Sequence, residues 1–246
     1  MNSPTADARV LMRLLRGMPR QGSQAERLEG FYGPQARDYD AFRERLLRGR
    51  RELIERMDIP DGAAVVELGA GTGRNVEFFG ERLSRMASID IVDLCPALVA
   101  AARRRVDSLA ARGIANTRVH LADATTWQPA APVDCVYFSY ALTMIPDWWR
   151  AIDNALSMLR PGGTLGVVDF YVGPPNPGPG ATVHGLFTRV FWPRWFGHDG
   201  VHPSPAHLAR LRLLLPDHSC REGRAPVPYL PGLRVPYYVF VGRRGG

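Results

Sequence analysis

The chain has 246 residues, 31 of them basic and 24 acidic, with a net charge of +7. This length suffices for one domain with a well-buried core. The sequence has no run of 18 uncharged apolar residues, and its start, MNSPTADARV, lacks the pattern of a secretory signal, so it predicts a cytoplasmic protein. Cys95, Cys135 and Cys220 lie far apart without metal-ligand spacing, which argues against a zinc motif or a disulfide framework, and no metal site is expected.

The positive charge is concentrated in the two flanks of the chain. Residues 1–60 hold 12 arginines and 9 acids, residues 61–170 hold 10 and 12, and residues 171–246 hold 9 and 3. Basic flanks of this kind suit phosphates, an anionic membrane surface or an acidic substrate.

We expect a single domain over residues 1–246, with an N-terminal helical lid (1–60), a cofactor-binding core (61–170) and a cap with the final strands (171–246). ARVLMRLLRGMPR (8–20) alternates aliphatic residues with arginines, a pattern typical of an amphipathic helix at a membrane interface.

The core alternates short apolar runs with helical patterns, which is typical of βαβ units and a parallel sheet. Helices are predicted after Pro96 and over DWWRAIDNALSMLR, and GPPNPGPG (173–180) is predicted to be a loop. The expected strands are residues 63–68, 86–93, 117–122, 133–139 and 163–170, with a final strand at 233–242.

A glycine-rich turn follows the first expected strand. ELGAGTGRN places Glu67, Gly69, Gly71 and Gly73 where a ligand can approach the backbone and a helix can begin. A dinucleotide fingerprint starting at Gly69 requires Gly or Ala at position 74, where this chain has Arg74, so NAD and FAD are disfavoured.

Acidic residues end the next two strands. Asp93 is placed to accept hydrogen bonds from ribose hydroxyls, and Asp123 lies where an adenine would be bound. Together with the turn, they predict S-adenosyl-L-methionine as the cofactor. Glu67 is expected near the cofactor's ammonium, in an indirect role. The expected contacts also include Asn75, Leu94, Ala124, Ser139 and Tyr140.

Several segments resemble one particular family, the N-methyltransferases of betaine-lipid synthesis, which convert diacylglyceryl-homoserine into diacylglyceryl-trimethylhomoserine. The similarity covers most of the chain, where Glu67 replaces an expected aspartate. The quoted segments are FYGPQARDYDAFRERLLRGR (31–50), VVELGAGTGRN, VDLCPAL, DATTW, FSYALTMIPDWWRAIDNAL, FWPRWFGHDGVH (191–202) and VPYLPGLRVPYYVFVG (227–242).

The resemblance implies a doubly wound α/β fold with a mostly parallel seven-stranded sheet, a helical lid and a C-terminal antiparallel strand. It also implies three successive methyl transfers to the amine of a diacylglyceryl-homoserine. Methyl transfer to an amine is an in-line displacement that needs an uncharged nitrogen, so a base or desolvation must assist.

Candidates for proton removal are His198, Asp199 and His202, clustered in GHDGVH. Tyr32 and Tyr39, from the lid segment, are candidates to contact the reacting amine, because aromatic faces attract ammonium groups. Tyr140 and Trp195 are further aromatic candidates, and Arg43 or Arg50 could hold a homoserine carboxylate.

Two alternatives remain: a methyltransferase for a soluble metabolite, and a basic binding module without catalysis. The intact turn and acids argue against the second, and no nucleic-acid-binding motif is recognisable. A peripheral position on an anionic inner-membrane surface is also expected, because HGLFTRVFWPRWFGH (184–198) interleaves aromatic residues with Arg189 and Arg194.

Overall fold

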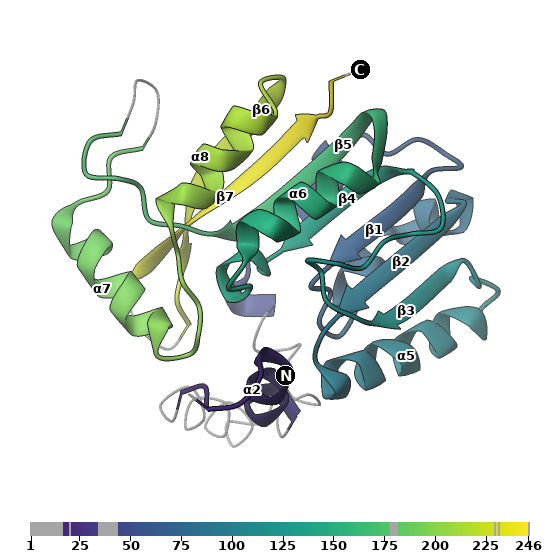
Figure 1. The fold of residues 1–246 in the computed structure, drawn as a ribbon, viewed down its shortest axis with the longest axis horizontal. Helices are drawn as coiled ribbons and strands as arrows, with labels where there is room; N and C mark the ends of the chain where they lie inside the picture. The colour runs from purple at the N-terminus through teal and green to yellow at the C-terminus, as the bar shows by residue number, and fades with distance from the viewer. Residues whose placement is uncertain are drawn as a thin grey trace.

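The structure is a computed structural model that describes residues 17–19, 21–33, 44–177, 182–228, 230 and 232–245. Its centre is one seven-stranded sheet (Figure 1) in the order β3-β2-β1-β4-β5-β7-β6. The strands are β1 Ala64–Leu68, β2 Ser88–Asp93, β3 Thr117–Leu121, β4 Val133–Ser139, β5 Leu159–Phe170, β6 His218–Pro226 and β7 Arg234–Arg243.

The five strands β1 to β5 pair in parallel, whereas β7 is antiparallel to both β5 and β6. Strand order reverses beside β1, where the chain leads from β1 to β2 on one side and later places β4 on the other. Ligands of open α/β sheets bind at the carboxyl edge beside such a reversal. The topology therefore puts a binding crevice at the ends of β1 and β4.

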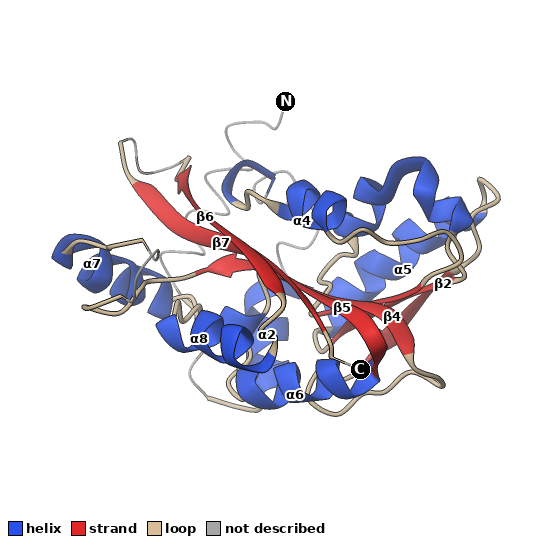
Figure 2. Cartoon of the chain, turned by 90° about the horizontal axis from the view of Figure 1, so that it is seen from above, coloured by secondary structure: helices blue, strands red, loops and turns tan. Residues whose placement is uncertain are grey.

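Helices cover both faces of the sheet (Figure 2), so the central strands are buried on both sides. On one face lie α4 (Arg50–Arg56), the 3₁₀ segment η2 (Arg74–Arg85) and α5 (Pro96–Ala110). On the other lie α6 (Trp148–Met158) and α8 (Pro205–Leu214). Successive side chains of β1 point to opposite faces, so Val65 packs in the apolar core under α4 and η2, and Val66 packs in the core under α6 and α8.

Three further elements lie near the carboxyl edge. Helix α2 (Gln24–Tyr32) begins at Ser23, whose hydroxyl accepts a hydrogen bond from the Glu26 N–H while the Glu26 carboxylate accepts one from the Ser23 N–H. The short turn η3 (Leu142–Met144) follows β4. Helix α7 (Leu186–Gly197) precedes α8 and lies at the edge of the molecule (Figure 1).

The structure confirms the expected mostly parallel seven-stranded sheet with an antiparallel C-terminal strand. Strand β6 was missed, because HSCREGRAP is a polar edge strand without an apolar run. The segment after the turn is a 3₁₀ helix kinked at Gly80, not a regular helix. Tyr39, Arg43 and most of the stretch 8–20 lie outside the described residues. No described helix is long and apolar enough to cross a membrane.

Candidate functional site

The glycine turn folds back onto the end of β2. Gly69, Gly71 and Gly73 all have positive φ, at 72°, 59° and 68°. Residues with a Cβ rarely adopt this region of backbone conformation. The N–H groups of Gly69 and Ala70 donate to the Val92 carbonyl, at 2.9 and 3.0 Å. A Cβ at Gly69 would collide with the Ala141 side chain, and one at Gly73 would approach Ile91 Cδ1 to 2.9 Å. Both glycines are therefore required for the turn's close packing.

Asp93 connects this turn to the start of α5. Its Oδ2 accepts from the Gly71 N–H at 2.7 Å, and its Oδ1 accepts from the Cys95 N–H at 2.9 Å. A carboxylate has about four acceptor sites, so these bonds are compatible with holding ribose hydroxyls as well. Asp123 uses Oδ1 to accept from the N–H and the hydroxyl of Thr125, both at 2.8 Å. Both strand-end acids are thus fixed by local backbone.

These elements surround one cavity that opens to solvent at the carboxyl edge of the sheet, where open α/β sheets bind their ligands. The residues predicted to bind the cofactor divide between this cavity and positions outside it. Those that line it are Gly69, Gly71, Asp93, Leu94, Asp123, Ala124 and Tyr140, and those that do not are Glu67, Gly73, Asn75 and Ser139.

Helix α2 closes one side of the cavity. Gln24 donates from Nε2 to the Met144 carbonyl at 2.9 Å, and the Tyr32 hydroxyl contacts Met144 Sδ at 2.9 Å. Glu29 accepts from the Ala97 N–H at 2.8 Å, which ties α2 to the first turn of α5. Gln24 and Tyr32, which belong to the segment expected to form a lid, line the cavity.

Tyr140 forms a rigid aromatic wall on the β4 side. It is a non-glycine residue at φ 56°, and such strain at a strand end is characteristic of functional sites. Its N–H donates to Val168 O at 2.7 Å, its hydroxyl donates to Arg48 O at 2.6 Å, and its ring meets Phe170 edge-on at 4.6 Å. Both ends of the side chain are therefore held while it lines the cavity.

The loop after Tyr140 depends on a buried carboxylate that the sequence analysis missed. Asp169, fully buried, accepts from the Thr143 hydroxyl at 2.8 Å, the Thr143 N–H at 3.1 Å and the Phe170 N–H at 2.8 Å. Burial raises the pKa of Asp169 to about 7. Its position at the end of β5, next to the crevice, was the available signal. Other unpredicted lining residues are Leu28, Leu98, Thr125, Ile145 and Asp147.

Glu67 faces the other side of the turn, within the core under α4 and η2. Its Oε1 accepts from Asn75 Nδ2 at 2.6 Å, and its Oε2 accepts from the Tyr137 hydroxyl at 2.8 Å. Burial raises the pKa of Glu67 to about 7, although the Asn75 and Tyr137 hydrogen bonds oppose that shift. The arrangement makes Glu67 a brace beneath the turn.

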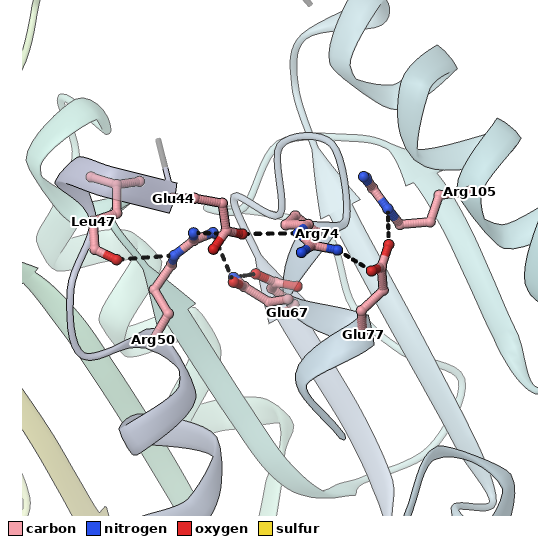
Figure 3. A network of polar contacts seen from close by, with 8 residues as sticks. Glu44, Leu47, Arg50, Glu67, Arg74, Glu77 and Arg105 are labelled. Carbon is pink, nitrogen blue, oxygen red and sulfur yellow. Dashed lines mark hydrogen bonds and ion pairs between the residues drawn. The ribbon is translucent and has the colours of Figure 1, made fainter. Parts of the chain in front are cut away.

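A chain of alternating charges continues from this brace to the surface (Figure 3). Arg50 donates from NH1 to Asn75 Oδ1 at 3.3 Å and pairs through NH2 with Glu44 at 3.1 Å. Glu44 also accepts from Arg74 Nε at 2.9 Å. The outer end is Glu77, which pairs with Arg74 and with Arg105. This network fixes the first turn of η2 against α4.

A small hollow lies between the turn and this network. It is lined by Gly69, Asn75, Arg50 and Ser139, among others. Ser139 Oγ is buried and has no hydrogen-bond partner among the described residues. Because Gly69 lines both spaces, these polar groups lie next to the cavity.

The GHDGVH loop lies beside the cavity but does not line it. The His202 N–H donates to Thr143 O at 2.7 Å, and the His198 carbonyl accepts from the Met18 N–H at 3.0 Å. Asp199 is buried, with Oδ1 unpartnered among the described residues, and burial raises its pKa to about 7. The structure does not bring these side chains to the Tyr32–Tyr140 wall, and their role in proton removal stays a prediction.

Comparisons with known proteins agree with this geometry. Residues 65–163 match the family model described as a methyltransferase domain. A trans-aconitate 2-methyltransferase of Variovorax paradoxus is 32% identical over 131 residues, which cover 52% of this chain and 47% of that protein. The chain therefore spans about half the length of this curated relative.

Two solved structures share the fold at low sequence identity. The YcgJ protein of Bacillus subtilis aligns with a TM-score of 0.65 at 15% identity, covering 80% of this chain and 98% of that one. Phosphoethanolamine N-methyltransferase 2 of Haemonchus contortus, solved with phosphomonomethylethanolamine and S-adenosylhomocysteine, aligns with a TM-score of 0.71 at 12% identity, covering 93% and 61%.

The fold is shared with these solved structures, and residues 65–163 are similar to a methyltransferase domain. S-adenosyl-L-methionine is the cofactor that they indicate. The site is compatible with this cofactor, because the glycine turn and the two strand-end acids line one open cavity at the carboxyl edge of the sheet.

Proposed function

We propose that this chain is an S-adenosylmethionine-dependent methyltransferase that acts on a small-molecule acceptor, and that the accepting atom is an amine nitrogen. The carrying observation is that the glycine turn, Asp93, Asp123 and the α2 lid line one cavity. The cofactor supplies the methyl group as a sulfonium. The chain's own residues position the two reactants and exclude water from them.

The charge of the cavity supports an amine over an acidic acceptor. Besides Asp93 and Asp123, which are assigned to the cofactor, its described lining contains the carboxylate of Asp147 and no Arg or His. A tricarboxylate such as trans-aconitate would need cationic partners there. An ammonium product, by contrast, is attracted by carboxylates and by aromatic faces such as those of Tyr32 and Tyr140.

The lining also suggests how an amine becomes reactive. Tyr32 on the α2 side, and Tyr140 and Met144 after β4, line the cavity with largely apolar surface. An amine held against them is desolvated, and desolvation lowers the pKa of an ammonium group and favours the neutral nucleophile. In this proposal, burial by the lid contributes the main share of deprotonation, with the GHDGVH loop as the candidate base.

Two kinds of acceptor are compatible with this proposal. The curated relative named for trans-aconitate favours a soluble metabolite. The amine of diacylglyceryl-homoserine is favoured by the sequence resemblance, which extends outside the matched domain into residues 31–50 and 191–202. The curated relatives support a soluble metabolite better, and the lipid amine is the finer proposal, which rests on the sequence resemblance.

The test combines cofactor binding with methyl transfer. S-adenosylhomocysteine should bind in calorimetry, and mass spectrometry should show gains of one to three methyl groups on diacylglyceryl-homoserine presented in detergent micelles. Trans-aconitate and free homoserine are the parallel acceptors. Binding without transfer to any amine would refute the amine assignment, and transfer to free homoserine alone would establish the soluble alternative.

Tyr32→Phe and Tyr32→Ala separate the aromatic ring from the hydroxyl. The Phe variant should keep most of its turnover, because it keeps the ring face while it loses the hydroxyl's contact with Met144 Sδ. The Ala variant should lose turnover by about tenfold or more, on the scale of a cation–π contact in a desolvated site. Equal activity of both variants would remove Tyr32 from the acceptor site.

A further inference from the structure

Helix α7 carries the main exposed apolar cluster of the described chain. Its solvent-exposed residues Leu186, Phe187 and Val190 are 69%, 59% and 42% exposed. Val183, which precedes the helix, is 68% exposed. The other exposed large apolar residues in the described ranges, Leu121, Trp149 and Leu213, lie on separate elements. Scattered apolar residues are ordinary on protein surfaces, whereas a contiguous patch marks an interaction site.

The patch has an ordered aromatic floor. Phe187 stacks on Phe191 at 5.0 Å and 13°, and Phe191 stacks on Trp195 at 5.6 Å and 21°. These residues are spaced by four along the helix, so their rings form a row along one face. A shallow groove runs over this row, bounded by Leu186, Val190 and Arg194.

The row is connected by packing to the wall of the cofactor cavity. Phe196, on the buried side of α7, stacks on Phe170 at 4.9 Å. Phe170 in turn contacts the Tyr140 ring at 4.6 Å, and Tyr140 lines the cavity. The exposed face of α7 is thus only a few side-chain layers from the place where an acceptor would react.

The positive charge of this face limits which partner can bind to it. Residues 182–198 contain Arg189 and Arg194 and no acidic residue, and no carboxylate of a described residue pairs with either arginine. A second copy docked by two-fold symmetry would bring the same arginines together. Residues 1–16 carry three arginines and one aspartate, so they too would add positive charge. An anionic surface is the complementary partner.

We propose that the exposed face of α7, comprising Val183, Leu186, Phe187, Val190 and Arg194, docks the protein on an anionic lipid surface without spanning it. The helix has 12 residues, whereas a membrane-spanning helix needs about 20. Apolar side chains enter the acyl boundary and arginine remains at the phosphate level, as in interfacial helices. The surface would present a lipid amine near the cavity, and in that respect the inference rests on the lipid-amine form of the proposed function.

Vesicle flotation tests the docking surface directly. The full chain is mixed at low salt with vesicles of phosphatidylcholine alone or of phosphatidylcholine and phosphatidylglycerol in equal amounts. These vesicles contain no acceptor lipid, and no cofactor is added, so a failure here leaves the methyltransferase assignment intact. We expect binding to the anionic vesicles that decreases as salt is added, because salt screens surface charge.

Three exposed-site variants identify the surface. Phe187→Ser with Val190→Ser should weaken anionic-vesicle binding by at least about tenfold, because both side chains would lose burial. Arg194→Gln should weaken it by about fivefold and reduce the salt dependence. Leu213→Ser is the matched control, because Leu213 is 76% exposed on α8, and it should bind like the unmodified chain.

Several results would overturn the proposal. The unmodified chain could fail to bind anionic vesicles at low salt, or the α7 variants could bind as well as the Leu213→Ser control. If deletion of residues 1–16 removes binding while the α7 variants keep it, the N-terminal segment is the docking element instead. If the Phe187→Ser and Val190→Ser protein changes from dimer to monomer in sedimentation without altered vesicle binding, the face is an interface between copies.

Discussion

Replacing Asp93 with asparagine tests the central contact of the site. The Asp93 carboxylate accepts one backbone hydrogen bond on each oxygen, from Gly71 at 2.7 Å and from Cys95 at 2.9 Å. Asparagine keeps one acceptor oxygen and places an amide N–H against the other backbone N–H. One charge-assisted bond is therefore lost and one donor is opposed by another donor.

The expected loss has two separable parts. Hydrogen bonds to charged groups contribute about 1.5–3 kcal/mol each, and Asp93 lies at the edge of an open cavity where water can replace part of that loss. We therefore expect Asp93→Asn to lower the free energy of unfolding by about 1–2 kcal/mol. A ribose held by the same carboxylate would lose a similar amount, which corresponds to about a 5- to 30-fold weaker affinity for S-adenosylhomocysteine.

Calorimetric titration measures the affinity, and urea unfolding measures the stability. Asp153→Asn is the matched control, since Asp153 is half exposed on α6 and bonds only to Arg210 among the described side chains. The control should change both quantities by less than about 1 kcal/mol. An Asp93→Asn protein that loses stability but binds S-adenosylhomocysteine as before would refute the ribose role and leave Asp93 as a brace for the turn.

Three further predictions address the turn, the buried acid beneath it and the aromatic wall. Gly69→Ala should abolish cofactor binding, and it should destabilise the fold more than the control Gly113→Ala. Both glycines have positive φ, but only at Gly69 would an added Cβ collide with Ala141. Equal unfolding midpoints of the two variants would contradict the close packing at Gly69. The folded pKa of Glu67 is raised to about 7 from 4.5, so its stabilisation is complete below pH 4.5 and is lost as pH rises through 7. The stability difference between the unmodified chain and Glu67→Gln should therefore fall between about pH 4.5 and 7 in urea unfolding, and a flat difference would show that the pKa of Glu67 is not raised in the fold. Tyr140→Phe should cost about 1 kcal/mol of stability for the lost bond to Arg48 while leaving turnover within a few-fold, and a large loss of turnover would assign the hydroxyl a chemical role.

The cofactor-binding edge could be predicted from the sequence because its signals are local. The Gly69–Gly73 turn needs positive φ at three positions, and only glycine adopts that region without strain. Asp93 and Asp123 follow apolar runs directly, so the parallel order of the strands brings both to one edge of the sheet. These features depend on a few adjacent residues and on the periodicity of strands.

The proposed acceptor side of the cavity was harder to predict from the sequence, because it is assembled from segments that are distant in sequence. Tyr32 contacts Met144, 112 residues away, and no sequence periodicity predicts that contact. The clustering of His198, Asp199 and His202 predicts a catalytic group, and that role remains untested; the structure places the loop beside the cavity, with Asp199 buried and outside its lining. Sequence proximity among polar residues says little about which way a loop faces.

The sequence by itself determined the class of fold, the turn and the acids at the strand ends, because local conformation and strand periodicity are encoded in neighbouring residues. Only the tertiary structure decided that Glu67 braces the turn from within the core, that Asp169 holds the loop after Tyr140, and that the apolar face of α7 stays exposed. These outcomes depend on which helix packs on which face of the sheet. That choice is made by the burial of many side chains together, and it cannot be read from any single segment.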